Sequence, residues 1–123
     1  MPTIAVSGSR ERLTLHDEQA IRAELVKFVG VIIHVGDCPT GVDAFIREVW
    51  PKSIRKDFCA DWGFGKRAGP ERNGRMLNGV SVLLAFPGPK SKGTLDAIKQ
   101  AIANGIETHV FPIGEAGEMS EED

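Results

Sequence analysis

Five short apolar segments alternate with segments of helical periodicity along this 123-residue chain. Residues 31–35 and 80–86 are almost continuously hydrophobic, a pattern typical of strands covered on both faces of a sheet. Residues 53–59 carry charges that indicate an edge strand instead. Residues 3–6 and 107–111 complete the set of five predicted strands.

The segments between these strands predict four helices. Thr14 is expected to cap the first, because acidic residues follow it in the first turn. The second and third are expected over residues 42–50 and 70–77, and the fourth is expected to run from Thr94 to a stop at Gly105. The residues expected to form the buried stripe of this last helix are Leu95, Ile98 and Ile102.

Regular alternation of strands and helices predicts an α/β fold with a parallel sheet and right-handed crossovers. We expect a single Rossmann-like three-layer domain over residues 1–113, with five strands in the order 3-2-1-4-5 and helices on both faces. Ligands of such sheets bind at the carboxyl ends of the strands, at the switch point. Residues 114–123 are expected to form an acidic, disordered tail.

The charge balance narrows the classes of partner. The net charge is −2, but the tail holds five acids, which leaves 15 basic against 12 acidic residues elsewhere. This small basic excess disfavours dedicated nucleic-acid binding and suits a local anion site. We expect a cytoplasmic protein with no membrane partner, because the sequence has no membrane-spanning run or signal-peptide pattern, and Cys38 and Cys59 are too few for a disulfide framework.

The loops that follow the first four strands are rich in glycine, and three of them carry Lys or Arg. Glycine lets backbone amides approach a ligand, and the N-termini of helices attract anions. We place a phosphate anchor where residues 87–94 lead into the last helix, with Ser9 and Arg10 opposite and Arg72 reaching in. The residues predicted to bind the ligand are Gly8, Ser9, Arg10, Gly36, Gly41, Asp43, Trp62, Arg72, Asn73, Gly88, Gly93 and Thr94.

Several familiar motifs are missing. No Gly-x-Gly-x-x-Gly follows the first strand, and Thr94 stands where a P-loop would have its lysine. The sequence has no Gly-x-Ser-x-Gly elbow and no metal-ligand spacing, so neither a metal nor a cofactor is expected. Trp62 is interpreted either as a platform for stacking on a base or as a cover for apolar surface.

The chain resembles the YspA-like, cpYpsA-related branch of the SLOG superfamily. The resemblance lies in residues 6–10, 36–43, 60–62, 68–77 and 84–88, and in Gly93-Thr94. The block Ala-Gly-Pro-x-Arg-Asn-x-x-Met at residues 68–76 is its most specific part. The resemblance implies a Rossmann-like fold and the binding, by sensors or effectors, of nucleotides or nucleotide derivatives.

A more distant resemblance raises an enzymatic alternative. Residues 71–76 and 87–97 are similar to motifs of the LOG-type phosphoribohydrolases of this superfamily, which cleave nucleoside 5′-monophosphates at the N-glycosidic bond. The position of their catalytic glutamate holds Ala97, and Pro89 replaces a glycine. The carboxylates that remain as candidates for catalysis are Asp43, Asp61, Glu71 and Asp96.

Two further alternatives remain open at this point. A DNA-binding domain like that of DprA fits the fold, but the weak net charge disfavours it. The apolar residues Phe45, Val49 and Trp50 on one short helix favour a homodimer, unless they cover the sheet of a monomer.

Overall fold

The computed structural model describes residues 2–11 and 13–113, so the tail predicted at residues 114–123 lies outside the described residues. Five parallel strands form one sheet in the order β3-β2-β1-β4-β5, which confirms the predicted order. The strands are β1 (Thr3–Gly8), β2 (Ile32–Gly36), β3 (Arg55–Phe58), β4 (Val82–Phe86) and β5 (Glu107–Val110).

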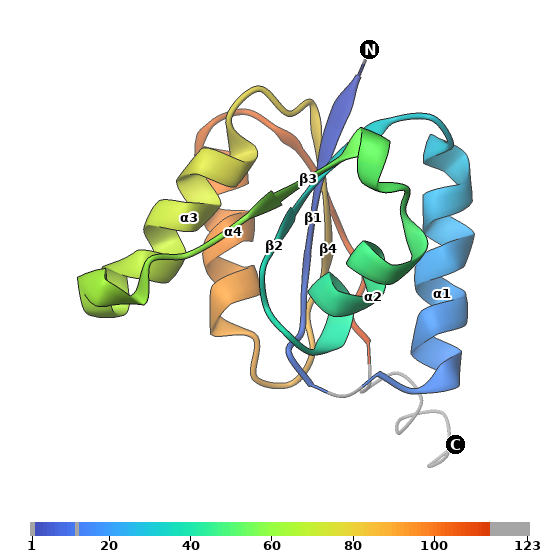
Figure 1. Ribbon diagram of the computed structural model, residues 1–123, viewed down its shortest axis with the longest axis horizontal. Helices are drawn as coiled ribbons and strands as arrows, with labels where there is room; N and C mark the ends of the chain where they lie inside the picture. Colours follow the sequence, from blue (N-terminus) through green and yellow to red (C-terminus); the bar gives the residue numbers. More distant parts are fainter. Residues whose placement is uncertain (1, 12, 114–123) are drawn as a thin grey trace.

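Helices cover both faces of the sheet, as predicted (Figure 1). The α-helices are α1 (Leu15–Leu25), α2 (Gly41–Val49), α3 (Ala68–Leu77) and α4 (Lys92–Ala103). Short 3₁₀ segments are η1 (Val26–Phe28), η2 (Lys52–Ile54) and η3 (Trp62–Arg67). Helices α1 and α2 lie on one face, while α3 and α4 lie on the other. None of the helices among the described residues has the length and apolar character to cross a membrane.

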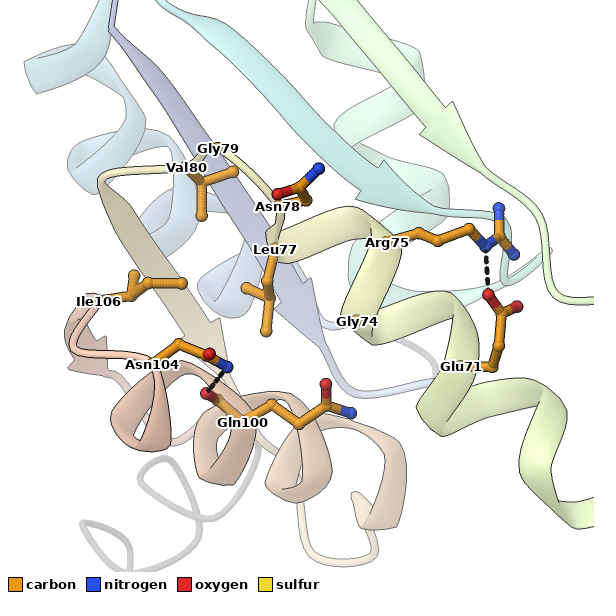
Figure 2. Close-up of a pocket in the computed structure, with 10 residues that line it drawn as sticks. All are labelled: Glu71, Gly74, Arg75, Leu77, Asn78, Gly79, Val80, Gln100, Asn104 and Ile106. Atoms are coloured by element: carbon orange, nitrogen blue, oxygen red, sulfur yellow. Dashed lines mark hydrogen bonds and ion pairs between the residues drawn. The ribbon is translucent and has the colours of Figure 1, made fainter.

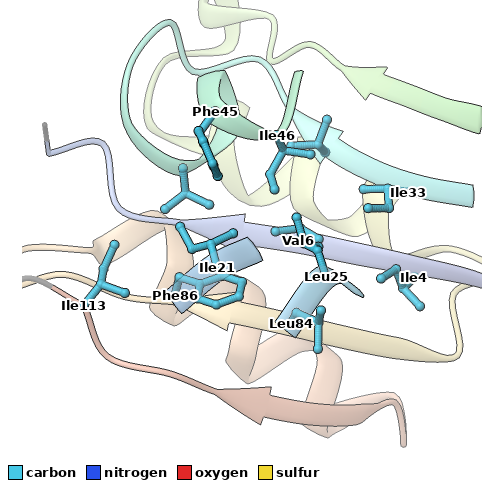
Figure 3. Packing of buried hydrophobic residues seen from close by; sticks show 12 residues of the cluster. Ile4, Val6, Ile21, Leu25, Ile33, Phe45, Ile46, Leu84, Phe86 and Ile113 are labelled. Carbon is cyan, nitrogen blue, oxygen red and sulfur yellow. The ribbon is translucent and has the colours of Figure 1, made fainter. Parts of the chain in front are cut away.

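Each face of the sheet has its own apolar core. Figure 3 shows the larger cluster, in which side chains of α1 and α2 meet alternate residues of the central strands. Ile21 and Ile46 are fully buried there against Val6 and Ile33. On the opposite face, α3 and α4 bury smaller side chains such as Ala97 against β1 and β4. The strand residues therefore face apolar side chains on both sides, which explains their continuous hydrophobic pattern.

Capping residues in the local sequence determine where α1 begins and where α4 ends. The Asp17 amide donates to the Thr14 hydroxyl over 3.1 Å, and the Thr14 amide donates to the Asp17 carboxylate over 3.2 Å. This reciprocal pair is a capping box, and it confirms Thr14 as the N-cap. Gly105 follows the last turn of α4 with a φ of +71°, the conformation that ends helices at glycine.

Several predicted boundaries differ from the structure by one or two residues, and two of them have a clear local reason. The third strand begins at Arg55 rather than at residue 53, because Lys52–Ile54 form a 3₁₀ turn. Helix α4 begins two residues before Thr94, with Ser91 at the N-cap position. Thr94 therefore lies within the first turn of the helix, where it is 3% exposed.

The predicted buried stripe of α4 was also wrong. Leu95 and Ile102 are 58% and 64% exposed, and Ile98 is only partly buried. The helix instead buries Thr94, Ala97 and Ala101. Small side chains let α4 lie close to its neighbours, as at Gly74 of α3, where an added Cβ would lie 3.3 Å from the Gln100 amide oxygen.

The apolar patch predicted for a homodimer is not exposed. Phe45 belongs to the core, and Val49 and Trp50 pack against it. The indole N–H of Trp50 donates to the Val31 carbonyl over 3.1 Å. These three side chains cover the sheet, which was the alternative interpretation.

The start of α2 depends on the conformation and small size of Gly41. Gly41 has a φ of +75°, and an added Cβ would collide with the Ser9 carbonyl oxygen and lie 2.8 Å from Arg10 Cα. Gly30 has a similar φ of +84° with nothing within 4 Å. It is a matched control, because it shares the backbone strain without the collision.

We expect Gly41→Ala to lower the free energy of unfolding by about 1–3 kcal/mol more than Gly30→Ala does. Both variants bear the left-handed strain of about 1–2 kcal/mol, and only Gly41→Ala adds an overpacking cost of about 1–3 kcal/mol. Urea unfolding, monitored by circular dichroism, measures the free energy of unfolding of both variants. Equal losses would show that the Ser9–Gly41 contact does not constrain the loop.

Candidate functional site

A cavity of about 550 Å³ opens at the carboxyl end of β1, beside the start of α4. Strands β1 and β4 are neighbours in the sheet, so the cavity lies at the predicted switch point. Its walls come from the loops after β1, β2 and β4 and from α2, α3 and α4. The lining residues are Ser7, Gly8, Arg10, Cys38, Asp43, Arg72, Pro89, Lys90, Ser91, Lys92, Gly93, Thr94 and Leu95.

Half of the predicted ligand residues line this cavity, and the others support it. The lining members are Gly8, Arg10, Asp43, Arg72, Gly93 and Thr94. Ser9, Gly36, Gly41, Asn73 and Gly88 do not line the cavity but hold its walls together, and Trp62 lies beyond Arg10. The lining residues that were not predicted as ligand contacts are Ser7, Cys38, Pro89, Lys90, Ser91, Lys92 and Leu95.

Ser9 joins three loops rather than facing a ligand. Its carbonyl oxygen accepts the Val42 amide over 2.9 Å, and its hydroxyl accepts the Glu11 amide over 3.0 Å. An added Cβ on Gly88 would lie 2.9 Å from Ser9 Cβ. Ser9 is 2% exposed, so it fixes the shape of the β1 loop and leaves the cavity wall to its neighbours.

Gly36, the last residue of β2, is the point where the two helical layers meet. Asp43 comes from α2 on one face, and Arg72 comes from α3 on the other. An added Cβ at Gly36 would lie 2.6 Å from Asp43 Oδ2 and 2.9 Å from Arg72 Nη1. The glycine therefore lets an acidic and a basic group meet over the strand end.

Arg72 is held in place by two hydrogen bonds. Its Nη1 donates to Asp37 Oδ1 over 2.7 Å, and its Nε donates to Asn73 Oδ1 over 3.1 Å. The side chain is 8% exposed and lines the cavity. Among the described residues nothing accepts a hydrogen bond from Nη2, so the protein leaves the two N–H groups of this nitrogen unpaired.

Asn73 connects Arg72 to the start of α4. Its amide nitrogen donates to the Gly93 carbonyl over 3.1 Å and to Asp96 Oδ2 over 2.9 Å. The same Asp96 oxygen accepts the Gln100 side chain over 2.8 Å. Asp96 therefore serves as a link between α3 and α4 and does not line the cavity.

Arg47 is not among the residues predicted from the sequence, although it shapes the loop after β2. Its Nη1 donates to the Gly36 carbonyl over 2.8 Å, and its Nη2 donates to the Cys38 carbonyl over 2.7 Å. This fork fixes two backbone oxygens beside Asp43. The sequence offered one signal for this role, namely that Arg47 is a basic residue one helical turn after a glycine-rich loop.

The start of α4 offers unpaired backbone donors to the cavity. The Ser91 hydroxyl accepts the Gly88 amide over 2.7 Å and does not cap the helix. No described residue accepts a hydrogen bond from the amides of Lys92, Gly93 or Thr94, which are the orphan donors of a helical first turn. The positive end of the helix dipole therefore faces the cavity without a cap.

Asp43 is the single acidic side chain on the cavity wall. It is 6% exposed, and burial raises the pKa of its carboxyl from the ordinary 3.8 to about 6, although Arg72, the Cys38 amide and Arg47 oppose this shift. Its Oδ1 is buried without a hydrogen-bond partner among the described residues. Burial therefore brings the titration of the Asp43 carboxyl closer to neutral pH and leaves one of its oxygens without a partner among the described residues.

The other carboxylates considered for catalysis lie elsewhere. Glu71 pairs with Arg75 over 2.8 Å beside a second cavity of about 570 Å³ between α3 and α4 (Figure 2). Asp61 accepts the Gly63 amide over 3.0 Å at the start of η3. Within the described part of the chain, no three His, Cys, Asp or Glu side chains are grouped to hold a metal ion.

Trp62 extends the site beyond the cavity wall. The Arg10 guanidinium lies over its ring, 5.7 Å from the centroid, within the range of a cation–π contact. The ring is 55% exposed. Both interpretations of Trp62 stay open, because the ring contacts a lining residue and still presents surface to solvent.

We expect the free energy of unfolding of Asp43→Asn to increase, relative to that of the wild type, as the pH rises from about 4 to about 6. Folded Asp43 binds its proton more tightly than the unfolded chain does, so raising the pH through this window destabilises the wild type only. The difference in unfolding free energy should grow by as much as about 3 kcal/mol. Paired urea titrations between pH 4 and 7 measure it, and a difference independent of pH would contradict the assignment.

Comparison with known proteins identifies a phage relative of this chain. No protein-family model and no solved structure matches the chain. The Gene 61 protein of Mycobacterium phage D29 is 32% identical over 119 residues, which cover 86% of this chain and 93% of the phage protein. Identity of this extent over nearly the whole of both chains places the present chain in the family of the phage Gene 61 protein.

Proposed function

We propose that this chain binds a nucleotide or a nucleotide-derived phosphate in the cavity at the carboxyl edge of its sheet, and so senses or sequesters that ligand. The observation that carries the proposal is the charge of the cavity wall. Of its charged side chains, Arg10, Arg72, Lys90 and Lys92 are basic, and only Asp43 is acidic. The whole chain has a net charge of −2, so this basic wall is a local feature.

The backbone supports an anion at the same place. The uncapped amides at the start of α4 lie beside Lys90 and Lys92 in the cavity lining, and helix N-termini of this kind bind phosphate groups. Arg72 adds a planar guanidinium whose geometry suits phosphate oxygens. We therefore assign the phosphate to the α4 side of the cavity.

The volume and the resemblance of the sequence support a nucleotide rather than phosphate alone. A cavity of about 550 Å³ is within the range of small-molecule sites. The resemblance to the YspA-like branch of the SLOG superfamily favours the same class of ligand, and membership of that branch is part of this proposal. We place the activity in the cytoplasm, in keeping with the free thiols of Cys38 and Cys59.

One observation favours a second function, cleavage of a nucleoside 5′-monophosphate at its N-glycosidic bond. Asp43 supplies a carboxylate with a pKa of about 6 in the cavity, and a pKa near the working pH suits general acid–base chemistry. Asp43 thus takes the place of the glutamate that the related phosphoribohydrolases have where this chain has Ala97. Binding remains our first proposal, because no second catalytic carboxylate lines the cavity among the described residues.

We expect Lys92→Ala to weaken the binding of adenosine 5′-monophosphate about threefold to tenfold. The loss of one exposed charge near a phosphate is worth about 1 kcal/mol. Lys99→Ala is the matched control, because Lys99 is an exposed lysine on the same helix that does not line the cavity. Isothermal titration calorimetry at low salt compares the two. Equal affinities in both variants would place the anchor elsewhere.

We further expect nucleoside monophosphates to remain intact when they are incubated with the purified protein. Chromatography for free base tests this expectation. Base release that is lost in Asp43→Asn would instead establish the glycosidase. Mass spectrometry of the small molecules released by heating the purified protein would identify the natural ligand in either case.

A further inference from the structure

Asp43 Oδ1 is the buried side-chain atom that the described residues leave without a hydrogen-bond partner. The polar side chains around Asp43 have hydrogen-bond partners. Arg72 is bonded to Asp37 and Asn73, and Arg47 is bonded to two backbone carbonyls. Since buried polar groups are nearly always paired, an unpaired oxygen on the wall of an anion-binding cavity indicates a donor supplied by the ligand.

The charges around Asp43 limit which kind of ligand group can be that donor. Arg72 and Arg47 both act on its carboxylate, and Arg10, Lys90 and Lys92 line the same cavity. A cationic ligand group would meet this positive field at a cost. An apolar group or another acceptor would leave Oδ1 unpaired. A neutral O–H or N–H group meets both conditions, because it donates a hydrogen bond and brings no charge.

The position of Asp43 favours a sugar hydroxyl over an N–H of the base, because the sugar is the part of a nucleotide next to the phosphate. Asp43 belongs to the first turn of α2, and the anchor belongs to the first turn of α4, and both turns line one cavity. The compound must therefore carry a phosphate and a hydroxyl on one small scaffold. The ribose 5-phosphate unit of a nucleotide has this arrangement, with hydroxyls at its 2′ and 3′ positions. A 2′-deoxyribose or 3′-deoxyribose unit lacks one of these two hydroxyls.

We infer that the cavity selects ribonucleotides over deoxyribonucleotides through a hydrogen bond from a ribose hydroxyl to Asp43. This inference rests on the proposed function, because it requires the phosphate to bind at the start of α4. It goes further in assigning the sugar as the part of the ligand that is recognised. A site built to pair a hydroxyl rejects the analogue that lacks it more strongly than an apolar pocket does.

Titration calorimetry with three nucleotides tests the selection. The probes are adenosine 5′-monophosphate, its 2′-deoxy analogue and its 3′-deoxy analogue. We expect at least one deoxy analogue to bind about tenfold to a hundredfold more weakly, the range for loss of a hydrogen bond to a charged group. The phosphate and the base are the same in all three probes, so this ratio reports on the sugar alone.

The Asp43→Ala variant identifies the residue responsible. We expect its ratio between the nucleotide and the deoxy analogue to fall close to one, while the affinity for the deoxy analogue changes little. Asp61→Asn is the control, because Asp61 is an exposed carboxylate after β3 that does not line the cavity, and its ratio should equal that of the wild type. If circular dichroism shows that Asp43→Ala is unfolded, Asp43→Asn replaces it, and its ratio should still fall below the wild-type value.

Each contrary outcome has a distinct meaning. Equal affinities for all three probes, with binding still weakened by Lys92→Ala, would overturn the inference and leave the proposed function standing. A wild-type ratio that persists in both Asp43 variants would overturn the role of Asp43. No binding of any probe at millimolar concentration would overturn both the inference and the proposed function.

Discussion

The arrangement of the site depends on the absence of a side chain at Gly36. This residue ends β2 between the two helical layers, and only a hydrogen atom leaves room there for Asp43 Oδ2 and Arg72 Nη1, whose helices lie on opposite faces of the sheet. Asp37 then pairs with Arg72, and Arg47 holds the Gly36 carbonyl. Two acids and two bases thus share one strand end, and together they position a buried guanidinium at the cavity. A Cβ at this position would separate the groups that the neighbouring loops are built around.

The fold could be predicted because its signals are local or periodic, whereas α4 shows where such signals fail. Leu95 and Ile102 have the spacing of a buried stripe, yet the helix turns Ala97 and Ala101 to the sheet. Helical periodicity gives two candidate stripes on adjacent sides of one helix, and hydrophobicity alone favours the larger side chains. The choice is made by the close approach of α3, where Asn73 holds the start of α4 through the Gly93 carbonyl. This tertiary contact has no counterpart in the local sequence.

The site was predictable at the level of loops and much less so at the level of residues. The carboxyl ends of parallel strands share one edge, so the glycine-rich loops had to gather there. Glycine itself does not reveal its role, since Gly93 lines the cavity while Gly88 makes room for Ser9. The pairing of Arg72 with Asp37 joins residues 35 positions apart. Sequence reasoning selected Arg72 from its motif but had no means of finding this partner, which decides how its guanidinium is oriented.

Under the proposed function, binding and selection of the ligand fall to different groups of the cavity wall. Lysines and helix amides attract any phosphate, because their interaction depends on charge and distance and not on what the phosphate is attached to. Asp43 contributes little to that attraction, since it is the one acid among four bases. Its buried Oδ1 costs free energy with every ligand that leaves it unpaired, about 1–3 kcal/mol by general experience with buried polar groups. An acidic group in this position therefore acts on the choice among phosphates more than on total affinity, which gives a physical reason for a small domain to retain a buried acidic side chain at some expense to its stability.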